Sequence, residues 1–109
     1  MSSSLNRIQI IGNITSEPIV KNNNGKKLAM FTIATNRNYK DSSWEKQQSV
    51  EFHDCIAWEL FASFIEQYAT KGSQLYVDWY IQTRSLVDDS WAKKYKKEIV
   101  TENLIFMSK

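Results

Sequence analysis

The hydrophobic period of the sequence changes once, at Glu59, and this change limits the folds that the chain can adopt. From Glu59 to Lys71 the apolar residues follow the spacing of an amphipathic helix, at Phe61, Phe64, Ile65 and Tyr68. Gly72 is expected to end this helix in a left-handed conformation, and Lys71 to complement the helix dipole. On both sides the apolar residues alternate with polar ones, which is typical of strands. The sequence therefore predicts an all-β domain with one helix.

The alternation of strands is found in five segments, at residues 5–11, 28–35, 50–57, 74–83 and 95–106. Segment 28–35 is largely apolar on both faces, so we expect it at the centre of the sheet. Pro18 and the Asn22–Gly25 run predict irregular chain and a tight turn. The polar segments 36–49 and 85–94 are expected to be exposed loops between strands.

Three strands, a helix and two further strands follow the order of the OB-fold, a partly open Greek-key barrel of five strands. A chain of 109 residues has the size of one compact domain, so residues 1–109 are expected to form a single OB-fold domain. No secretory signal is recognisable, and no segment has the roughly 18 apolar residues that predict a membrane helix. The single cysteine, Cys55, excludes an intrachain disulfide, and these features together predict a cytoplasmic protein.

His53 and Cys55 lie two residues apart on one face of the third strand, within reach of one metal ion. Structural zinc takes about four ligands, and the chain has no second histidine or cysteine to add. As a nucleophile pair, the two residues lack an orienting third group, and the sequence has no nucleophile elbow or phosphate-binding loop. We expect a binding protein with no enzyme activity, no metal and no cofactor.

Short motifs run along nearly the whole chain in a fixed order: Asn6-Arg7-Ile8, Ile11 to Ile14, Glu17-Pro18, Phe31 to Asn36, Glu51-Phe52-His53, Tyr68 with Lys71 to Val77, and Thr83-Arg84. In order and spacing they resemble the bacterial and mitochondrial single-stranded DNA-binding proteins. The resemblance implies an OB-fold homotetramer, with a dimer as the alternative, that binds single-stranded DNA at the nucleoid during DNA replication, recombination and repair. It also implies that His53 and Tyr76 lie at a subunit interface.

Several positions depart from the family pattern. Trp79 stands where the family usually has glycine, Leu86 where an aromatic residue is common, and Asp54 where a basic residue is frequent. Trp79 is open to three interpretations, as a core residue, a subunit contact or a further stacking platform. The family's long tail with an acidic tip is not found in this sequence. Either the sequence is truncated or the chain is a short divergent member of the family, such as a phage or plasmid protein, and recruitment of replication and repair proteins stays open.

Binding of unpaired nucleic acid without sequence reading needs rings for base stacking and cations along the phosphates. Tyr39, Phe52 and Trp58 match the family's base-stacking positions, and Trp91 is a fourth candidate. Each ring also has a structural interpretation. Phe52 could be a core residue in its strand, Trp58 could hold the helix in place, and Trp91 could anchor its loop.

The predicted phosphate contacts come from six cations: Arg7, Lys21, Arg37, Lys71, Arg84 and Lys94. For any one of them, a solvated surface charge is the alternative, and the net charge of +2 does not decide between the two. Segment 93–97 interleaves lysines with Tyr95, which suits a backbone track but also suits an edge strand protected from aggregation. The alternative function is an OB-fold protein-interaction module, such as a primosome component, with weak affinity for nucleic acid.

Overall fold

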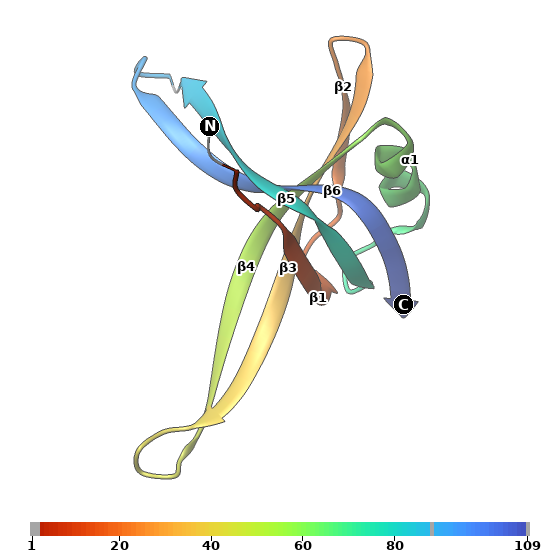
Figure 1. Cartoon of the computed structure of the whole chain (residues 1–109). Helices are drawn as coiled ribbons and strands as arrows, with labels where there is room; N and C mark the ends of the chain where they lie inside the picture. Colours follow the sequence, from red (N-terminus) through yellow and green to blue (C-terminus); the bar gives the residue numbers. More distant parts are fainter. Residues whose placement is uncertain (1–2, 88, 109) are drawn as a thin grey trace.

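Six strands and one helix make up the computed structural model of the chain, which describes residues 3–87 and 89–108 (Figure 1). In chain order the elements are β1 (Ile8–Ile14), β2 (Ile19–Asn23), β3 (Lys26–Lys40), β4 (Lys46–Trp58), α1 (Glu59–Tyr68), β5 (Gln74–Val87) and β6 (Lys93–Ser108). No helix among the described residues is long and apolar enough to cross a bilayer.

The strands form one sheet in the order β1-β5-β6-β4-β3-β2, and an additional pairing of β1 with β3 closes five of them into a barrel. At this closure Asn13 pairs with Ala34. Gly12 is needed beside it, because any Cβ atom there would collide with the backbone carbonyl of Ala34. The barrel, with α1 between β4 and β5, confirms the predicted OB-fold.

The main core fills the inside of the barrel. It joins alternate residues of the strands to the buried face of α1, and its larger members are Ile10, Ile14, Phe31, Ile33, Ile65, Leu75, Val77 and Ile99. A second cluster lies on the opposite face of the strands and consists of Leu28, Ile56 and Val100. The apolar character of segment 28–35 on both faces is thereby explained, since β3 contributes to both clusters.

Trp79 packs against the second cluster together with Tyr80, its neighbour in sequence. Successive residues of a regular strand point to opposite faces, so both rings could not reach one cluster without an irregularity. A shift in the β5–β6 register between Asp78 and Trp79 supplies it. The contacts of Trp79 are therefore those of a partly buried residue packed against the second cluster, which agrees with the first of its three interpretations, a core residue.

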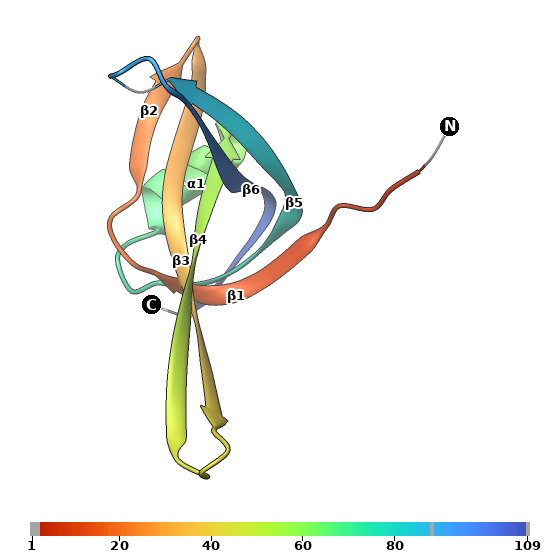
Figure 2. The same cartoon turned by 90° about the vertical axis from the view of Figure 1, so that its left-hand side faces the viewer.

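Two long hairpins extend from the barrel in different directions (Figures 1 and 2). The β3–β4 ladder continues without a register shift to the pair Lys40 and Lys46, and the β5–β6 ladder continues to the pair Val87 and Lys93. The predicted loops over 36–49 and 85–94 were therefore too long. Two-stranded ribbons can be polar on both sides, because the two strands satisfy each other's backbone groups while both faces meet water.

Four other expectations need correction. β2, in the segment predicted to be irregular, is a short edge strand paired with β3, although the predicted tight turn at Asn24 and Gly25 is present. The helix ends at Tyr68 rather than near Lys71, which leaves no basic residue in its last turn. Gly72 is left-handed as expected, but in the turn before β5, where its N–H donates to the carbonyl of Ile14. Phe64 and Tyr68 are largely exposed, and Ala62 and Ile65 form the buried face of α1.

Candidate nucleic-acid interface

The face of the strands that carries the second cluster, here called the outer face, brings several predicted residues together. Pairing in register joins Lys21 of β2 to Leu28 of β3, and Leu28 to Trp58 of β4. Phe52 lies on the same face of β4 as Trp58, because the two positions differ by an even number and side chains alternate between faces along a strand. Further along, Arg84 and Lys94 lie on this face of the β5–β6 hairpin, since Tyr80 pairs with Val100 and the alternation continues from that pair.

The aromatic residues on these strands differ in exposure. Phe52 is 66% exposed, which makes the core interpretation of this residue wrong. Trp58 is half-buried against the second cluster and occupies the N-cap position of α1, where its side chain makes no capping hydrogen bond. Tyr39 is 39% exposed and pairs with Gln47. This register directs the Tyr39 ring to the opposite side of the hairpin from Phe52, so the two rings share the ribbon but not a face.

Two of the predicted cations lie against rings. The guanidinium of Arg37 is 4.9 Å from the centroid of the Tyr39 ring, and that of Arg7 is 5.7 Å from the Trp79 ring. Cations at this distance from a ring face are attracted by its quadrupole, which holds both groups in place. In contrast, Lys71 lies in the turn between α1 and β5, where its backbone N–H donates to Glu17, and is not brought to the outer face.

Arg84 is paired with a buried carboxylate. Its Nη2 donates to Oε2 of Glu98 at 3.0 Å, and the Glu98 side chain is only 2% exposed whereas that of Arg84 is 37% exposed. Removing a charge from water is costly unless it is paired, so Arg84 compensates the buried Glu98. Any phosphate contact of Arg84 would therefore be shared with an ion pair inside the protein.

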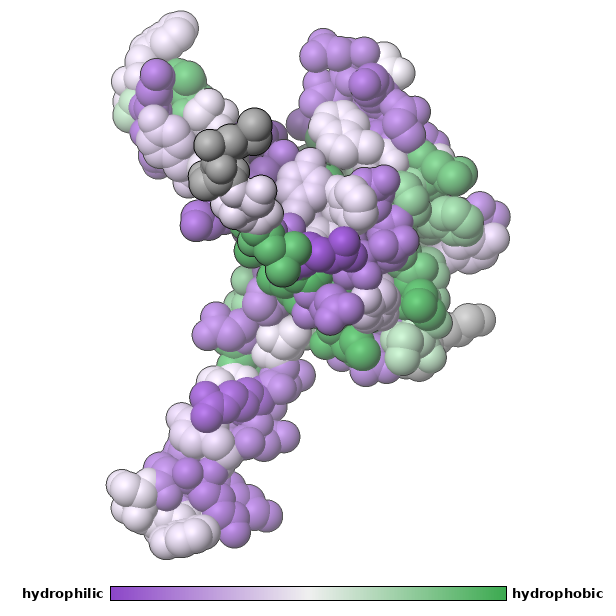
Figure 3. All heavy atoms as spheres, in the orientation of Figure 1, coloured by the Kyte–Doolittle hydropathy of each residue, from purple (hydrophilic) through white to green (hydrophobic). Residues whose placement is uncertain are grey.

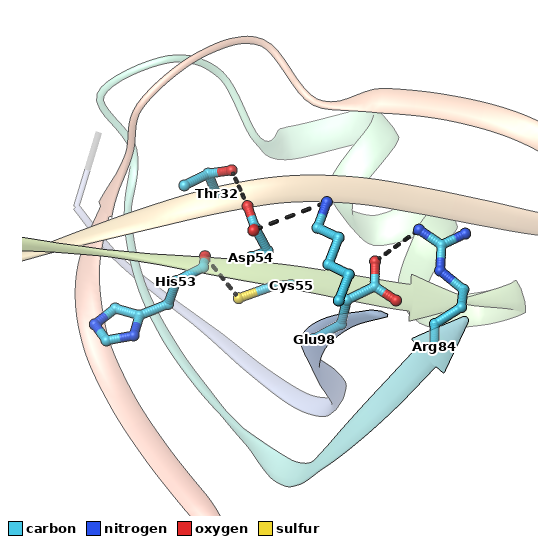
Figure 4. Close-up of polar contacts among 7 residues, drawn as sticks. Thr32, His53, Asp54, Cys55, Arg84 and Glu98 are labelled. Carbon is cyan, nitrogen blue, oxygen red and sulfur yellow. Dashed lines mark hydrogen bonds and ion pairs between the residues drawn. The ribbon is translucent and has the colours of Figure 1, made fainter. Parts of the chain in front are cut away.

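Asp54 places a negative charge on the outer face, between Phe52 and Ile56 (Figure 4). The hydroxyl of Thr32 donates to its Oδ1 at 3.0 Å, and the ammonium of Lys96 lies 3.8 Å from its Oδ2. Lys96 thus offsets the negative charge of Asp54, which stands at a position where the family frequently has a basic residue. A hollow of about 190 Å³ opens beside this pair and is also lined by Ile19 and Met30.

The sequence model of the Single-strand binding protein family matches residues 5–107 of the chain. The chain belongs to this family. It is 36% identical over 106 residues to "Single-stranded DNA-binding protein 1" of Chlorobaculum tepidum, covering 95% of this chain and 65% of that protein. It is likewise 36% identical to the "Single-stranded DNA-binding protein" of Rickettsia typhi, covering 94% of this chain and 70% of that protein.

A solved structure extends this comparison to three dimensions. The structure described as "Plasmodium falciparum SSB complex with ssDNA" superposes with a TM-score of 0.89 at 30% identity, covering 99% of both chains. The curated relatives are longer, and this chain spans 65% and 70% of the two named above. The family resemblance expected from the sequence motifs is confirmed.

In this single-strand binding family member, His53 and Cys55 do not form a reactive pair. Cys55 is buried in the barrel core, and its Sγ lies 3.6 Å from the backbone carbonyl of His53 rather than from the imidazole (Figure 4). Burial, followed by the nearby charge of Asp54, raises the pKa of the Cys55 thiol to about 12. The His53 Nε2 is 2.9 Å from the hydroxyl of Thr35. Among the described residues, no three potential metal ligands gather.

Tyr76 lies on the outward side of the β1–β5–β6 region, away from the two hairpin tips, in a polar network that the sequence did not reveal. Its hydroxyl donates to Asp78 and accepts from the amide of Gln9 at 3.1 Å, and Asn103 donates to Asp78 at 2.7 Å. The hydrogen bonds from Tyr76 and Asn103 lower the pKa of Asp78. Alternation along β5 turns the half-buried Tyr76 away from Leu75 and Val77 of the core, but the approach of Gln9 depends on the pairing of β1 with β5, which only the tertiary structure gives.

The hydropathy of the surface distinguishes the β3–β4 hairpin from the rest of the molecule. In Figure 3 the outer part of this hairpin is covered by hydrophilic and intermediate side chains, whereas strongly hydrophobic ones gather over the barrel and also appear at the end of the β5–β6 hairpin. Trp91 lies in the turn between β5 and β6 and is 86% exposed, so it does not anchor that turn by burial. The protruding parts of the molecule therefore offer rings and charges to the solvent rather than a continuous apolar surface.

Proposed function

We propose that this chain binds single-stranded DNA with little dependence on sequence, through rings and cations of the outer face and the two hairpins. The observation that carries the proposal is the exposed Phe52 ring on a strand face that also holds Lys21, Arg84 and Lys94. The relatives at 36% identity are named single-stranded DNA-binding proteins, and the similar Plasmodium falciparum protein is described in complex with ssDNA. These names favour DNA binding over the alternative of a protein-interaction module.

The mechanism follows from two physical terms. Every base has a flat face, so stacking on a ring contributes roughly 1–3 kcal/mol per base whatever the sequence. Cations along the path replace the counterions of the phosphates, and their release makes the affinity fall as salt rises. We assign stacking to the rings of Tyr39, Phe52, Trp58 and Trp91. We assign backbone contacts to Arg7, Lys21, Arg37, Lys71, Arg84 and Lys94. Of these, Lys71 lies in the turn between α1 and β5, and Arg84 is also paired with Glu98.

Residues 1–109 act in this proposal as one OB-fold domain that binds and protects DNA without catalysing a reaction, at the nucleoid in the cytoplasm, in replication, recombination and repair. The functional unit is a homotetramer, with a dimer as the alternative. Support comes from the surface around Tyr76, where Ile11 and Ile105 are exposed beside a satisfied polar network. His53 is also assigned to a subunit interface, and its Nε2 lies 2.9 Å from the hydroxyl of Thr35.

The proposal is tested by titrating the chain with oligo-dT and recording its tryptophan fluorescence at two salt concentrations. We expect quenching on binding, and an affinity that falls as salt rises. Duplex DNA of equal length serves as the competitor. Equal competition by the duplex, or retained oligomerisation with no quenching by oligo-dT, would overturn the proposal.

A further inference from the structure

The tip of the β3–β4 hairpin carries an exposed tryptophan that the residues assigned above do not include. Trp44 is 78% exposed, and the ammonium of Lys40 lies 5.7 Å from the centroid of its ring. We propose that Trp44 is a further base-stacking site for single-stranded nucleic acid, reached by a strand that continues along the hairpin beyond Tyr39. This inference rests on the proposed function and extends the same binding path.

The turn that presents Trp44 is fixed by Asp41. The Asp41 carboxylate accepts hydrogen bonds from the backbone N–H of Ser43 at 2.9 Å, from that of Glu45 at 3.0 Å and from the Gln47 amide at 3.1 Å. The Asp41 carbonyl also accepts from the N–H of Trp44 at 2.9 Å. A turn held by four bonds to one residue positions the ring without the need to bury it.

The backbone at Trp44 is in the left-handed region, with φ of 61°. Asparagine and glycine adopt this conformation readily, whereas bulky side chains rarely do. A ring that is both exposed and conformationally unfavourable contributes little to folding. An outlier of this kind is typical of a site retained for binding.

The hairpin surface at Tyr39 and Lys40, next to the turn that carries Trp44, is hollowed. A hollow of about 390 Å³ lies on the hairpin and is lined by Asn38, Tyr39, Lys40, Lys46 and Gln47. Rings and cations follow one another along this part of the chain, first Arg37 over Tyr39 and then Lys40 over Trp44. Alternating rings and positive charges are what a single strand needs, since each nucleotide brings one base to stack and one phosphate to neutralise.

The test compares the full-length wild-type chain with Trp44→Asn and Trp44→Tyr, using oligo-dT of increasing length. Asparagine tolerates the left-handed backbone, so the turn is kept while the ring is lost, and tyrosine keeps a ring as the matched control. For oligonucleotides long enough to reach the tip, Trp44→Asn is expected to bind about five- to 100-fold more weakly, and Trp44→Tyr close to wild type. For the shortest oligonucleotides that bind, the two variants should equal wild type.

The possible outcomes separate this site from the function on which it rests. If wild type binds and Trp44→Asn matches it at every length, the stacking site is wrong, and a protein partner becomes the better occupant of the tip. If wild type binds no oligonucleotide, the proposed function itself is wrong and the site falls with it. A loss in Trp44→Asn that is equal at all lengths would also contradict a site reached only by longer strands.

Discussion

The two hairpins that leave the barrel have similar backbones and different chemistry. Each ends in an exposed tryptophan with a left-handed backbone, Trp44 with φ of 61° on β3–β4 and Trp91 with φ of 65° on β5–β6. The β3–β4 hairpin pairs its cations with rings, as at Arg37 and Tyr39. The β5–β6 hairpin instead concentrates lysines in segment 93–97. The two hairpins thus differ in how they present cations, which lie over rings on β3–β4 and follow one another as a run of lysines on β5–β6.

The two hairpins also differ where they leave the barrel. Where β5–β6 leaves the barrel, Arg84 of β5 forms an ion pair with the buried Glu98 of β6. The corresponding part of β3–β4 carries Asp54, which is half-exposed and is held by Thr32 and Lys96. A buried pair affects folding when it is broken, whereas an exposed charge acts mainly on ligands nearby. Charge changes at these two sites should therefore appear in different measurements, in unfolding at Arg84 and Glu98 and in DNA binding at Asp54.

The largest effect is expected from removing the rings of the β3–β4 hairpin. Tyr39→Ala combined with Phe52→Ala should weaken oligo-dT binding by about 2–6 kcal/mol, if each ring stacks on one base. Stability against urea should change little, since Phe52 is mostly exposed. Phe31→Ala, which removes a buried ring, is the contrast and should cost about 3–5 kcal/mol in unfolding free energy. Unchanged DNA affinity in the double variant would contradict a stacking role for this hairpin.

The next effect concerns the free energy of unfolding and the ion pair where β5–β6 leaves the barrel. Arg84→Met should lower the free energy of unfolding by about 3 kcal/mol, because it leaves the Glu98 carboxylate buried without its partner. Urea denaturation measures the change. The double variant Arg84→Met with Glu98→Met removes both charges and should recover most of the loss. If the double variant is no more stable than the single one, the loss in the single variant does not come from an unpaired Glu98 carboxylate.

Charge on the β5–β6 hairpin should appear in the salt dependence of binding. Replacing Lys93, Lys94, Lys96 and Lys97 by glutamine should reduce the slope of log affinity against log salt by about 0.7 for each lysine that contacts a phosphate. Glutamine at Arg37, Lys40 and Lys46 provides the comparison on the β3–β4 hairpin, with the loss of slope expressed per charge removed. Equal losses of slope in both variants would remove the distinction between a stacking hairpin and a charged one.

A smaller effect is expected at Asp54. Asp54→Asn should raise the affinity for oligo-dT roughly fivefold, since a nearby negative charge costs on the order of 1 kcal/mol against each phosphate in water. The variant should also steepen the salt dependence, because Lys96 is then free of its carboxylate partner. Isothermal titration at two salt concentrations measures both changes. Weaker binding by Asp54→Asn would indicate that the carboxylate accepts a hydrogen bond from the bases instead.

The smallest effect concerns pH and the tip of β3–β4. The pKa of Asp41 is lowered from its ordinary value of 3.8, first by the hydrogen bond from the Glu45 N–H and then by those from Ser43 and Gln47. A lowered folded pKa means that the carboxylate stabilises the turn above pH 3.8, and that this contribution is lost as the pH falls through the folded pKa. Amide chemical shifts of Ser43 and Glu45 should therefore stay constant at neutral pH and move only in acid. A transition above pH 5 would contradict this assignment.

Local patterns decided the class of fold. The alternation of apolar residues and the one helical stripe after Glu59 depend only on neighbours in sequence, so the order of the OB-fold could be predicted. The ring positions at Tyr39, Phe52 and Trp58 came from motifs and were also available without the structure. The tight turn at Asn24 and Gly25 followed in the same way, because both residues accept a left-handed backbone.

Contacts between distant segments decided the rest. Only the pairing of β3 with β4 showed that Phe52 points to water and that Tyr39 lies on the other side of the ribbon. The bulge after Asp78 turned Trp79 onto the second cluster, and an isolated strand pattern carries no sign of such a shift. The burial of Glu98 against Arg84 likewise required strands brought together by the barrel. Period and turn chemistry are properties of short segments, whereas register and burial arise when segments far apart in the chain share hydrogen bonds and exclude water.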